Sequence, residues 1–277
     1  MTKNLYQLLQ QAQQAFPRNT ALYFKEKSLS YTELLHQVNG VAATLQQQGI
    51  KRFDRVAVYL PKQFDTIYTI WGANAIGGVF VPVNPALKAV QVQHILQDCN
   101  VRVLVTSKER LSTLTEVLAA CPDLHTVLLT DESETGQSMA HIAVKPLLAV
   151  NHGDEVPADS ALQGALTDSD MAAILYTSGS TGKPKGVVLS QRNMLVGASS
   201  VATYLENRAD DVILALLPLS FDYGLSQLTT AFSTGASVVL LDFFLVQDVV
   251  RAVARHQVTG IAAVPPLWAQ LAKAKWS

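Results

Sequence analysis

The sequence predicts an α/β fold in which mostly parallel strands alternate with helices. Short runs rich in Val, Leu, Ile and Ala alternate with longer segments whose apolar residues recur every three or four positions. The short runs are apolar at consecutive positions, which is typical of strands covered on both faces in parallel βαβ units. The chain has 277 residues, of which 49% are hydrophobic and 16% charged, so it can bury an extensive core.

The first part of the chain contains four expected strands. Pro61 closes the first of them, and Gly77 and Gly78 end the helix that follows. The expected strands span residues 55–60, 79–83, 101–106 and 126–130, and the expected helices span residues 63–76, 88–97 and 109–119.

The periodicity fades between Asp131 and about Asp168. A structureless connection of this length is unusual inside a compact domain, so we expect it either to cross between two sheets or to hold short strands. After it the alternation resumes, and Ser190 supplies a hydroxyl suited to capping a helix. The expected strands are residues 171–177, 187–189, 212–216, 237–241 and 258–264, and the expected helices begin at residue 190 and span residues 222–233, 247–256 and 266–275.

Composition excludes several classes of protein. The formal net charge is −1, so no basic excess is present to hold nucleic acid. The uncharged stretch of residues 66–87 is interrupted by Asn, Gly and Pro, which indicates a buried soluble segment and no membrane span. The polar N-terminus lacks the apolar segment of a secretory signal. Cys99 and Cys121 have no paired neighbour, which fits reduced thiols in a cytoplasmic protein.

The segment from Tyr176 to Gly186 carries the clearest chemical signal. It contains three glycines, four serines or threonines and two lysines directly after a buried strand. Glycines allow backbone N–H groups to approach an anion, hydroxyls donate to phosphate oxygens, and lysine adds a positive charge. The segment therefore predicts a cradle for a polyphosphate. The alternative is a flexible polar loop between two strands.

This segment is not a Walker loop. Only two residues separate Gly179 from Gly182, and Pro184 follows Lys183 where a Walker loop has Ser or Thr and then a helix. Loop amides, hydroxyls and lysine would hold the phosphates here.

Residues 177–186 resemble the phosphate-loop signature of the adenylate-forming superfamily, which includes acyl-CoA synthetases and peptide-synthetase adenylation domains. The segments at 30–34, 54–57, 77–85 and 264–266 also resemble the N-terminal region of that superfamily. Residues 219–231 and 258–267 are most similar to AMP-forming acyl-CoA ligases associated with exosortase and PEP-CTERM systems. Gln191 stands where the family often has His.

The resemblance implies a reaction in which a carboxylate attacks the α-phosphate of ATP. Pyrophosphate leaves, an acyl-adenylate forms, and the thiol of CoA or of a phosphopantetheine carrier then takes the acyl group. Mg²⁺ would bridge the phosphates, and Lys185 would act in catalysis. No residue of this chain is assigned as a metal ligand. The residues expected to bind ATP are Thr177, Ser178, Gly179, Ser180, Thr181, Gly182, Lys185 and Gly186.

Phe221, Asp222 and Gly224 form a second candidate site for the acid. Peptide-synthetase adenylation domains resemble this segment in placing Asp after an aromatic residue, where the carboxylate binds the amine of the substrate. The alternative is structural: Asp222 caps the helix over residues 223–233 and accepts from the backbone N–H of Gly224 or Leu225. We favour the cap slightly, so plain acyl acids are the first expectation.

The resemblance also implies two mostly parallel sheets flanked by helices. Residues 50–190 would build mainly one layer, and residues 1–49 with 191–277 the other, all within the N-terminal region of an AMP-binding domain. The adenine, ribose and magnesium ligands and the C-terminal lysine of the family are not found, so we expect a fragment that lacks its C-terminal domain and is inactive alone. The alternatives are an amino-acid-activating adenylation domain and a non-catalytic nucleotide-binding remnant.

Overall fold

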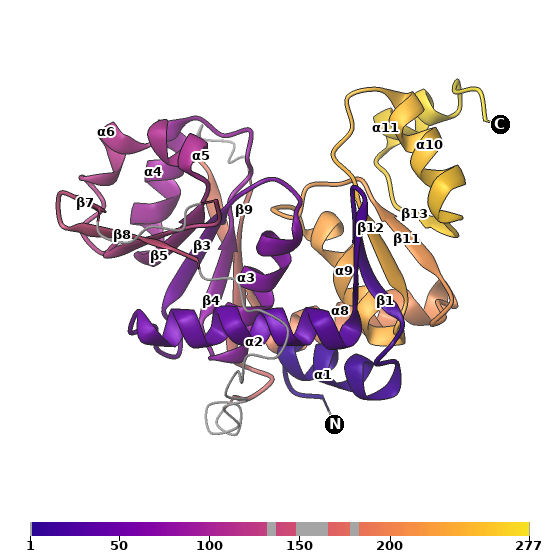
Figure 1. The fold of residues 1–277 in the computed structure, drawn as a ribbon, viewed down its shortest axis with the longest axis horizontal. Coiled ribbons are helices and arrows are strands. Elements are labelled where there is room, and N and C mark those ends of the chain that lie inside the picture. Colours follow the sequence, from indigo (N-terminus) through magenta and orange to yellow (C-terminus); the bar gives the residue numbers. More distant parts are fainter. Residues whose placement is uncertain (1, 132–136, 148–165, 178–182, 277) are drawn as a thin grey trace.

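Two sheets and the helices around them make up the described chain (Figure 1). The computed structural model describes residues 2–131, 137–147, 166–177 and 183–276. One sheet has eight strands in the order β10-β9-β4-β3-β5-β6-β8-β7, and the other has five in the order β13-β11-β12-β1-β2. Most neighbouring strands run parallel in both sheets, which confirms the predicted fold class.

The eight-stranded sheet is built around parallel strands joined by helices. Among its described strands, only β10 and β7 pair antiparallel with their neighbours. Its strands are β3 (Arg55–Tyr59), β4 (Val79–Pro82), β5 (Val101–Thr106), β6 (Thr126–Leu129), β7 (Gln137–Met139), β8 (Ile142–Pro146), β9 (Met171–Thr177) and β10 (Lys185–Ser190). The helices of this part are α3 (Phe64–Ala75), α4 (Ala89–Asp98), α5 (Lys108–Ser112) and α6 (Thr115–Leu118).

The long segment after β6 holds two short strands, which was one of the two alternatives expected for it. β7 and β8 extend the eight-stranded sheet beyond β6, and β9 then pairs with β4 in the same sheet. The other alternative, a crossing between two sheets, is wrong. The single helix expected over residues 109–119 is instead two short helices.

The five-stranded sheet joins the two ends of the chain. β1 pairs parallel with β12, and β2 turns back antiparallel on β1 at the edge. Its strands are β1 (Thr20–Phe24), β2 (Lys27–Ser30), β11 (Val212–Ala215), β12 (Ser237–Leu240) and β13 (Gly260–Ile261), and its helices are α1 (Leu5–Ala15), α2 (Tyr31–Gln47), α8 (Gln191–Tyr204), α9 (Asp222–Thr234), α10 (Val246–His256) and α11 (Pro265–Leu271).

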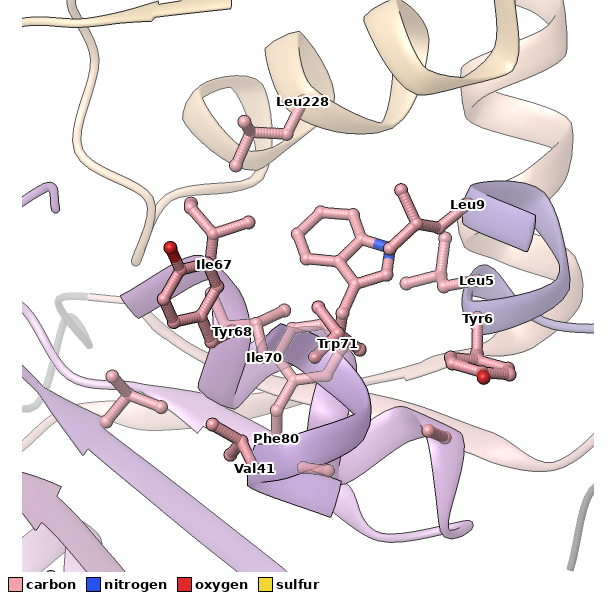
Figure 2. Close-up of a cluster of buried hydrophobic side chains, with 14 of the residues drawn as sticks. Leu5, Tyr6, Leu9, Val41, Ile67, Tyr68, Ile70, Trp71, Phe80 and Leu228 are labelled. Atoms are coloured by element: carbon pink, nitrogen blue, oxygen red, sulfur yellow. The ribbon is translucent and has the colours of Figure 1, made fainter. Parts of the chain in front are cut away.

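A continuous core joins the helices that lie between the two sheets. Trp71 of α3 is fully buried against Phe232 of α9, with ring centroids 5.0 Å apart. Figure 2 shows Trp71 between Leu9 of α1 and Ile67 of its own helix, with Leu228 of α9 above them. Burying one side chain of this size stabilises the fold by roughly 1.5–3 kcal/mol. The packing of α3 against α1 and α9 therefore helps to hold the two sheets together.

Serine side chains cap two helices, and the cap at Ser190 was predicted from the sequence. The Ser30 side chain accepts from the backbone N–H of Glu33, and Glu33 reaches back to the backbone of Ser30. Ser190 and Asn193 form the same reciprocal pair at the start of α8. Each pair satisfies backbone donors that the first turn of a helix leaves free.

The uncharged stretch of residues 66–87 consists mainly of α3 and β4, both buried. None of the helices in the described ranges is long and apolar enough to cross a membrane. Cys99 and Cys121 are both free and buried. Burial raises the pKa of Cys99 to about 11, so its thiol stays protonated at neutral pH.

Candidate active site

The candidate site lies where strands of both sheets end. Thr177 is the last residue of β9 and Pro82 the last of β4, while Phe221 follows β11. Ligands of open α/β sheets bind in the crevice outside the carboxyl ends of the strands. A pocket of about 550 Å³ occupies this position, lined by Pro82, Asn84, Leu87, Gln91, Ile95, Tyr176, Thr177, Pro184, Pro218, Ser220 and Phe221.

The stem of the glycine-rich segment is a strand pair. Thr177 of β9 lies directly opposite Lys185 of β10 in the antiparallel ladder. Both side chains are exposed, and Lys185 forms no ion pair with any residue in the described ranges. The stem thus presents a hydroxyl and an ammonium next to each other. The predicted ligands Ser178, Gly179, Ser180, Thr181 and Gly182 lie outside the described residues.

Two side chains of α4 hold this stem in place. The Nε2 atom of His94 lies 3.1 Å from the carbonyl oxygen of Pro184. The Tyr176 hydroxyl donates to a carboxylate oxygen of Asp98 at 2.6 Å. Burial and the hydrogen bond to Asp98 raise the pKa of Tyr176, so this hydroxyl remains a donor. Sequence analysis missed these contacts because α4 is far from the stem along the chain, and neither His94 nor Asp98 belongs to a recognisable motif.

Gly186 has a structural reason to be glycine. It pairs with Tyr176 inside the β9–β10 ladder. A Cβ atom there would lie 2.8 Å from Cγ2 of Ile174 and 3.1 Å from Cζ of Tyr176. The close packing of β10 on β9 therefore explains this glycine without a ligand, and its assignment to ATP binding stays a prediction.

Asp222 does not cap α9, so the favoured structural alternative is wrong. Asp222 is itself the first residue of the helix, Phe221 occupies the cap position, and no side chain caps this end. The Asp222 carboxylate is exposed and makes no hydrogen bond or ion pair with the rest of the described chain. Its charge still interacts favourably with the positive end of the helix dipole.

Phe221 and Gly224 have separate roles at the start of α9. Phe221 is 48% exposed and forms one wall of the pocket beside Thr177. Gly224 is buried, and a Cβ atom there would lie 1.9 Å from the carbonyl oxygen of Pro218. Glycine therefore allows the loop before α9 to fold back onto its first turn.

The structure thus brings some of the predicted residues together. Thr177 and Phe221 line the same pocket, whereas Lys185, Asp222 and Gly224 are not among its lining residues. Within the described ranges, no three His, Cys, Asp or Glu side chains come together as a metal site. A smaller cavity of about 90 Å³ shares four lining residues with this pocket: Pro82, Asn84, Pro218 and Ser220. The buried Lys62, which sequence analysis did not single out, also lines this cavity.

Comparison with known proteins assigns this fold to a class. Residues 9–276 match the family described as AMP-binding enzyme. The chain belongs to the AMP-binding enzyme family, and its fold is that of the N-terminal region of acyl-CoA synthetase-like, adenylate-forming proteins.

Relatives of two kinds share this region. The crotonobetaine/carnitine–CoA ligase of Salmonella choleraesuis is 29% identical over 271 residues, which cover 95% of this chain and 51% of that protein. Tyrocidine synthase 3 of Brevibacillus parabrevis is 28% identical over 270 residues, which cover 96% of this chain and 4% of that protein. The chain thus spans about half of the first relative and a small part of the second.

A solved structure agrees with the fold. The anthranilate CoA ligase AuaEII, crystallised with anthranoyl-AMP, superposes with a TM-score of 0.85 at 22% identity. The match covers 96% of this chain and 51% of that one.

Proposed function

We propose that this chain is the nucleotide-binding part of a ligase that activates a carboxylic acid with ATP. The supporting observation is the Thr177–Gly186 segment, whose stem ends beside an open pocket at the carboxyl edge of the sheet in a member of the AMP-binding enzyme family. The acid would become an acyl-adenylate, and the acyl group would then pass to the thiol of CoA or of a phosphopantetheine carrier.

The chain's own residues would act mainly by holding charge and position. The hydroxyls of Thr177, Ser178, Ser180 and Thr181 and the ammonium of Lys185 would bind the β- and γ-phosphates. A carboxylate oxygen of the acid then attacks the α-phosphorus while the bond to pyrophosphate breaks. In the second step the sulfur, having lost its proton, attacks the acyl carbon and AMP leaves. Positioning and neutralisation of charge are the main requirements of such transfers.

Magnesium would accompany the polyphosphate. Mg²⁺ prefers oxygen ligands, keeps several waters and binds through substrate phosphates in most nucleotide sites. The hydroxyl-rich segment from Thr177 fits this arrangement, because it offers donors and a cation to the phosphates and leaves phosphate oxygens to the metal.

Acids that carry an amine are the second candidate substrates. Because Asp222 caps nothing and has no partner in the described chain, its carboxylate is available to a cationic group. One of the two relatives above is a tyrocidine synthase and the other a crotonobetaine/carnitine–CoA ligase. We therefore propose two candidate functions. The first is an acyl-CoA ligase of the exosortase and PEP-CTERM-associated type, and the second is an amino-acid-activating adenylation domain.

We also propose that the chain works as the N-terminal part of a longer cytoplasmic enzyme. The matched ligase extends well beyond the aligned region, since this chain covers 51% of it. Residues 1–277 would form one part of an AMP-binding domain, with one layer mainly from residues 50–190 and the other from residues 1–49 and 191–277. A C-terminal domain would complete the site, and the 277-residue chain would be inactive alone. A non-catalytic nucleotide-binding remnant is the competing proposal.

An ATP–pyrophosphate exchange assay tests these proposals. The purified 277-residue chain and the protein encoded by its complete reading frame are each assayed with fatty acids, aryl acids and amino acids. We expect acid-dependent exchange in the longer protein only. Exchange by the short chain would contradict its inactivity, and no exchange with any acid in the longer protein would favour the non-catalytic remnant.

A further inference from the structure

Lys62 is a buried lysine at the point where the two sheets meet. It lies between the end of β3 and the start of α3, and its side chain is 4% exposed. Its ammonium donates to the carbonyl oxygens of Ala215 at 3.0 Å and Leu216 at 2.7 Å. The carboxylate of Asp242, which follows β12, lies 3.3 Å from the same nitrogen. One side chain from the connection between β3 and α3 therefore contacts the chain at the carboxyl ends of β11 and β12.

The position of these acceptors explains how a buried ammonium is stabilised there. β11 and β12 run parallel, so their carboxyl ends point to the same edge and carbonyl oxygens collect there. An ammonium donates three hydrogen bonds and suits such a cluster. Burial lowers the pKa of Lys62, whereas Asp242 opposes that shift. The backbone N–H of Lys62 also donates to Asp242, at 3.2 Å, so the contact is made twice.

The segment that Lys62 holds leads directly into the candidate site. A longer contact of 3.5 Å reaches the carbonyl of Leu217, next to Pro218. The carbonyl of Pro218 accepts from the backbone N–H of Phe221, and Gly224 allows the close approach at that carbonyl. A continuous set of contacts therefore runs from Lys62 to Phe221.

We propose that Lys62 is a positioning residue, whose ammonium fixes the loop of residues 215–221 and thereby places Phe221 at the wall of the pocket. Lys62 itself does not line the pocket that contains Thr177. Placement of the loop is a property of this chain alone, whereas its consequence for the reaction rests on the proposed function.

Hydrogen exchange of the 277-residue chain tests the placement. Lys62→Met keeps the aliphatic stem and removes the charge, and Lys51→Met is the matched control because Lys51 is exposed. In Lys62→Met we expect amides of residues 216–225 to exchange about tenfold faster or more, with those of β3, β4 and β5 unchanged. Lys62→Arg should restore slow exchange, because the guanidinium keeps the charge and donors and the cavity of about 90 Å³ beside Lys62 offers room.

Three results would overturn the proposal. These are unchanged exchange over residues 216–225 in Lys62→Met, equal acceleration throughout the chain, or no recovery in Lys62→Arg. If Lys62→Met does not fold, Lys62→Gln takes its place, because it removes the ammonium and keeps a polar group in the buried site. In that variant, unchanged exchange of the same amides would also overturn the proposal.

A kinetic measurement then tests the consequence for the reaction. In the protein that shows pyrophosphate exchange, Lys62→Met should raise the KM for the acid about tenfold or more and change the KM for ATP little, because the loop borders the acid site. Equal effects on both substrates would contradict a positioning role. If the unaltered protein shows no exchange with any acid, the proposed function fails while the hydrogen-exchange result still stands.

Discussion

Gly224 shows how the absence of a Cβ atom determines the shape of the candidate site. The loop before α9 passes so close to the helix that a Cβ atom would lie 1.9 Å from the Pro218 carbonyl oxygen. Real structures do not tolerate such a distance, so any larger residue must displace either the loop or the helix.

We expect Gly224→Ala to destabilise the protein by about 1–3 kcal/mol, because overpacking forces backbone shifts of that cost. Gly197→Ala is the control, since a Cβ atom on this α8 glycine has nothing within 4 Å. Alanine there should leave stability unchanged or raise it by up to about 1 kcal/mol. Urea denaturation compares the two variants, and equal stability in both would contradict the packing explanation.

Lys185 is the residue from which we expect the largest effect on nucleotide binding. A charge-assisted hydrogen bond contributes roughly 1.5–3 kcal/mol. Lys185→Ala should therefore slow pyrophosphate exchange at least about tenfold in the protein that shows such exchange. Lys183→Ala serves as the control, because Lys183 is also exposed but is not among the residues expected to bind ATP. Similar losses in both variants would show a general effect of positive charge and no specific role for Lys185.

Sequence reasoning predicted a polyphosphate-binding segment because the residues that suggest it are contiguous. It missed His94, Asp98 and Lys62 for the opposite reason: each contacts a segment far along the chain, and spacing in the sequence carries no trace of such a contact. The cap assigned to Asp222 failed by one position. The helix begins at Asp222 itself, and helix boundaries are the least certain part of any prediction from sequence.

The capping box at the start of α2 allows the stabilisation of a single helix to be tested. The Ser30 hydroxyl satisfies a backbone donor of the first turn. Ser30→Ala should cost about 1 kcal/mol of stability, because that donor loses its partner. Ser28→Ala, in the exposed part of β2, provides the control and should be nearly neutral. Thermal melting distinguishes them, and a neutral Ser30→Ala would show that water replaces the cap without cost.

Elements with strong periodicity were predicted well and elements held by distant partners were not. β3, β4, β5, β9 and α3 agree with their expected positions within a few residues. β1 and β2 were not predicted, because their short and partly polar sequences become strands through pairing with each other and with β12. β13 has two residues in place of the expected seven, since β11 is its single neighbour in the described sheet.

Asp170 connects two distant parts of the molecule, the start of β9 and the segment before β3. Its carboxylate accepts from Arg52 at 2.7 Å and from the Thr167 backbone at 3.0 Å. Burial alone would raise the pKa of Asp170, but the hydrogen bonds from Thr167 and Arg52 outweigh burial and lower it. The unfolded chain therefore takes up this proton first as the pH falls, so the stabilisation is complete above about pH 5 and is lost progressively below it.

We expect Asp170→Asn to reduce stability at pH 7 by about 1–3 kcal/mol, because the charged hydrogen bonds are weakened. The variant should also lose less stability than the unaltered chain between about pH 5 and pH 3. Urea midpoints measured across this range check both effects. Asp210→Asn is the control, because Asp210 is exposed. A parallel loss of stability with acid in Asp170→Asn and the unaltered chain would assign the acid sensitivity to other carboxylates.

The pairing of β1 with β12 constrains the order in which the molecule can assemble during synthesis. Strands β3 to β10 leave the ribosome in succession and can pair before the rest is made, whereas Leu22 must wait for Val238. Until then the N-terminal hairpin has an open edge, and such edges pair with wrong partners. We expect the glutamines of α1, which precedes this hairpin in the chain, to help keep the waiting segment soluble.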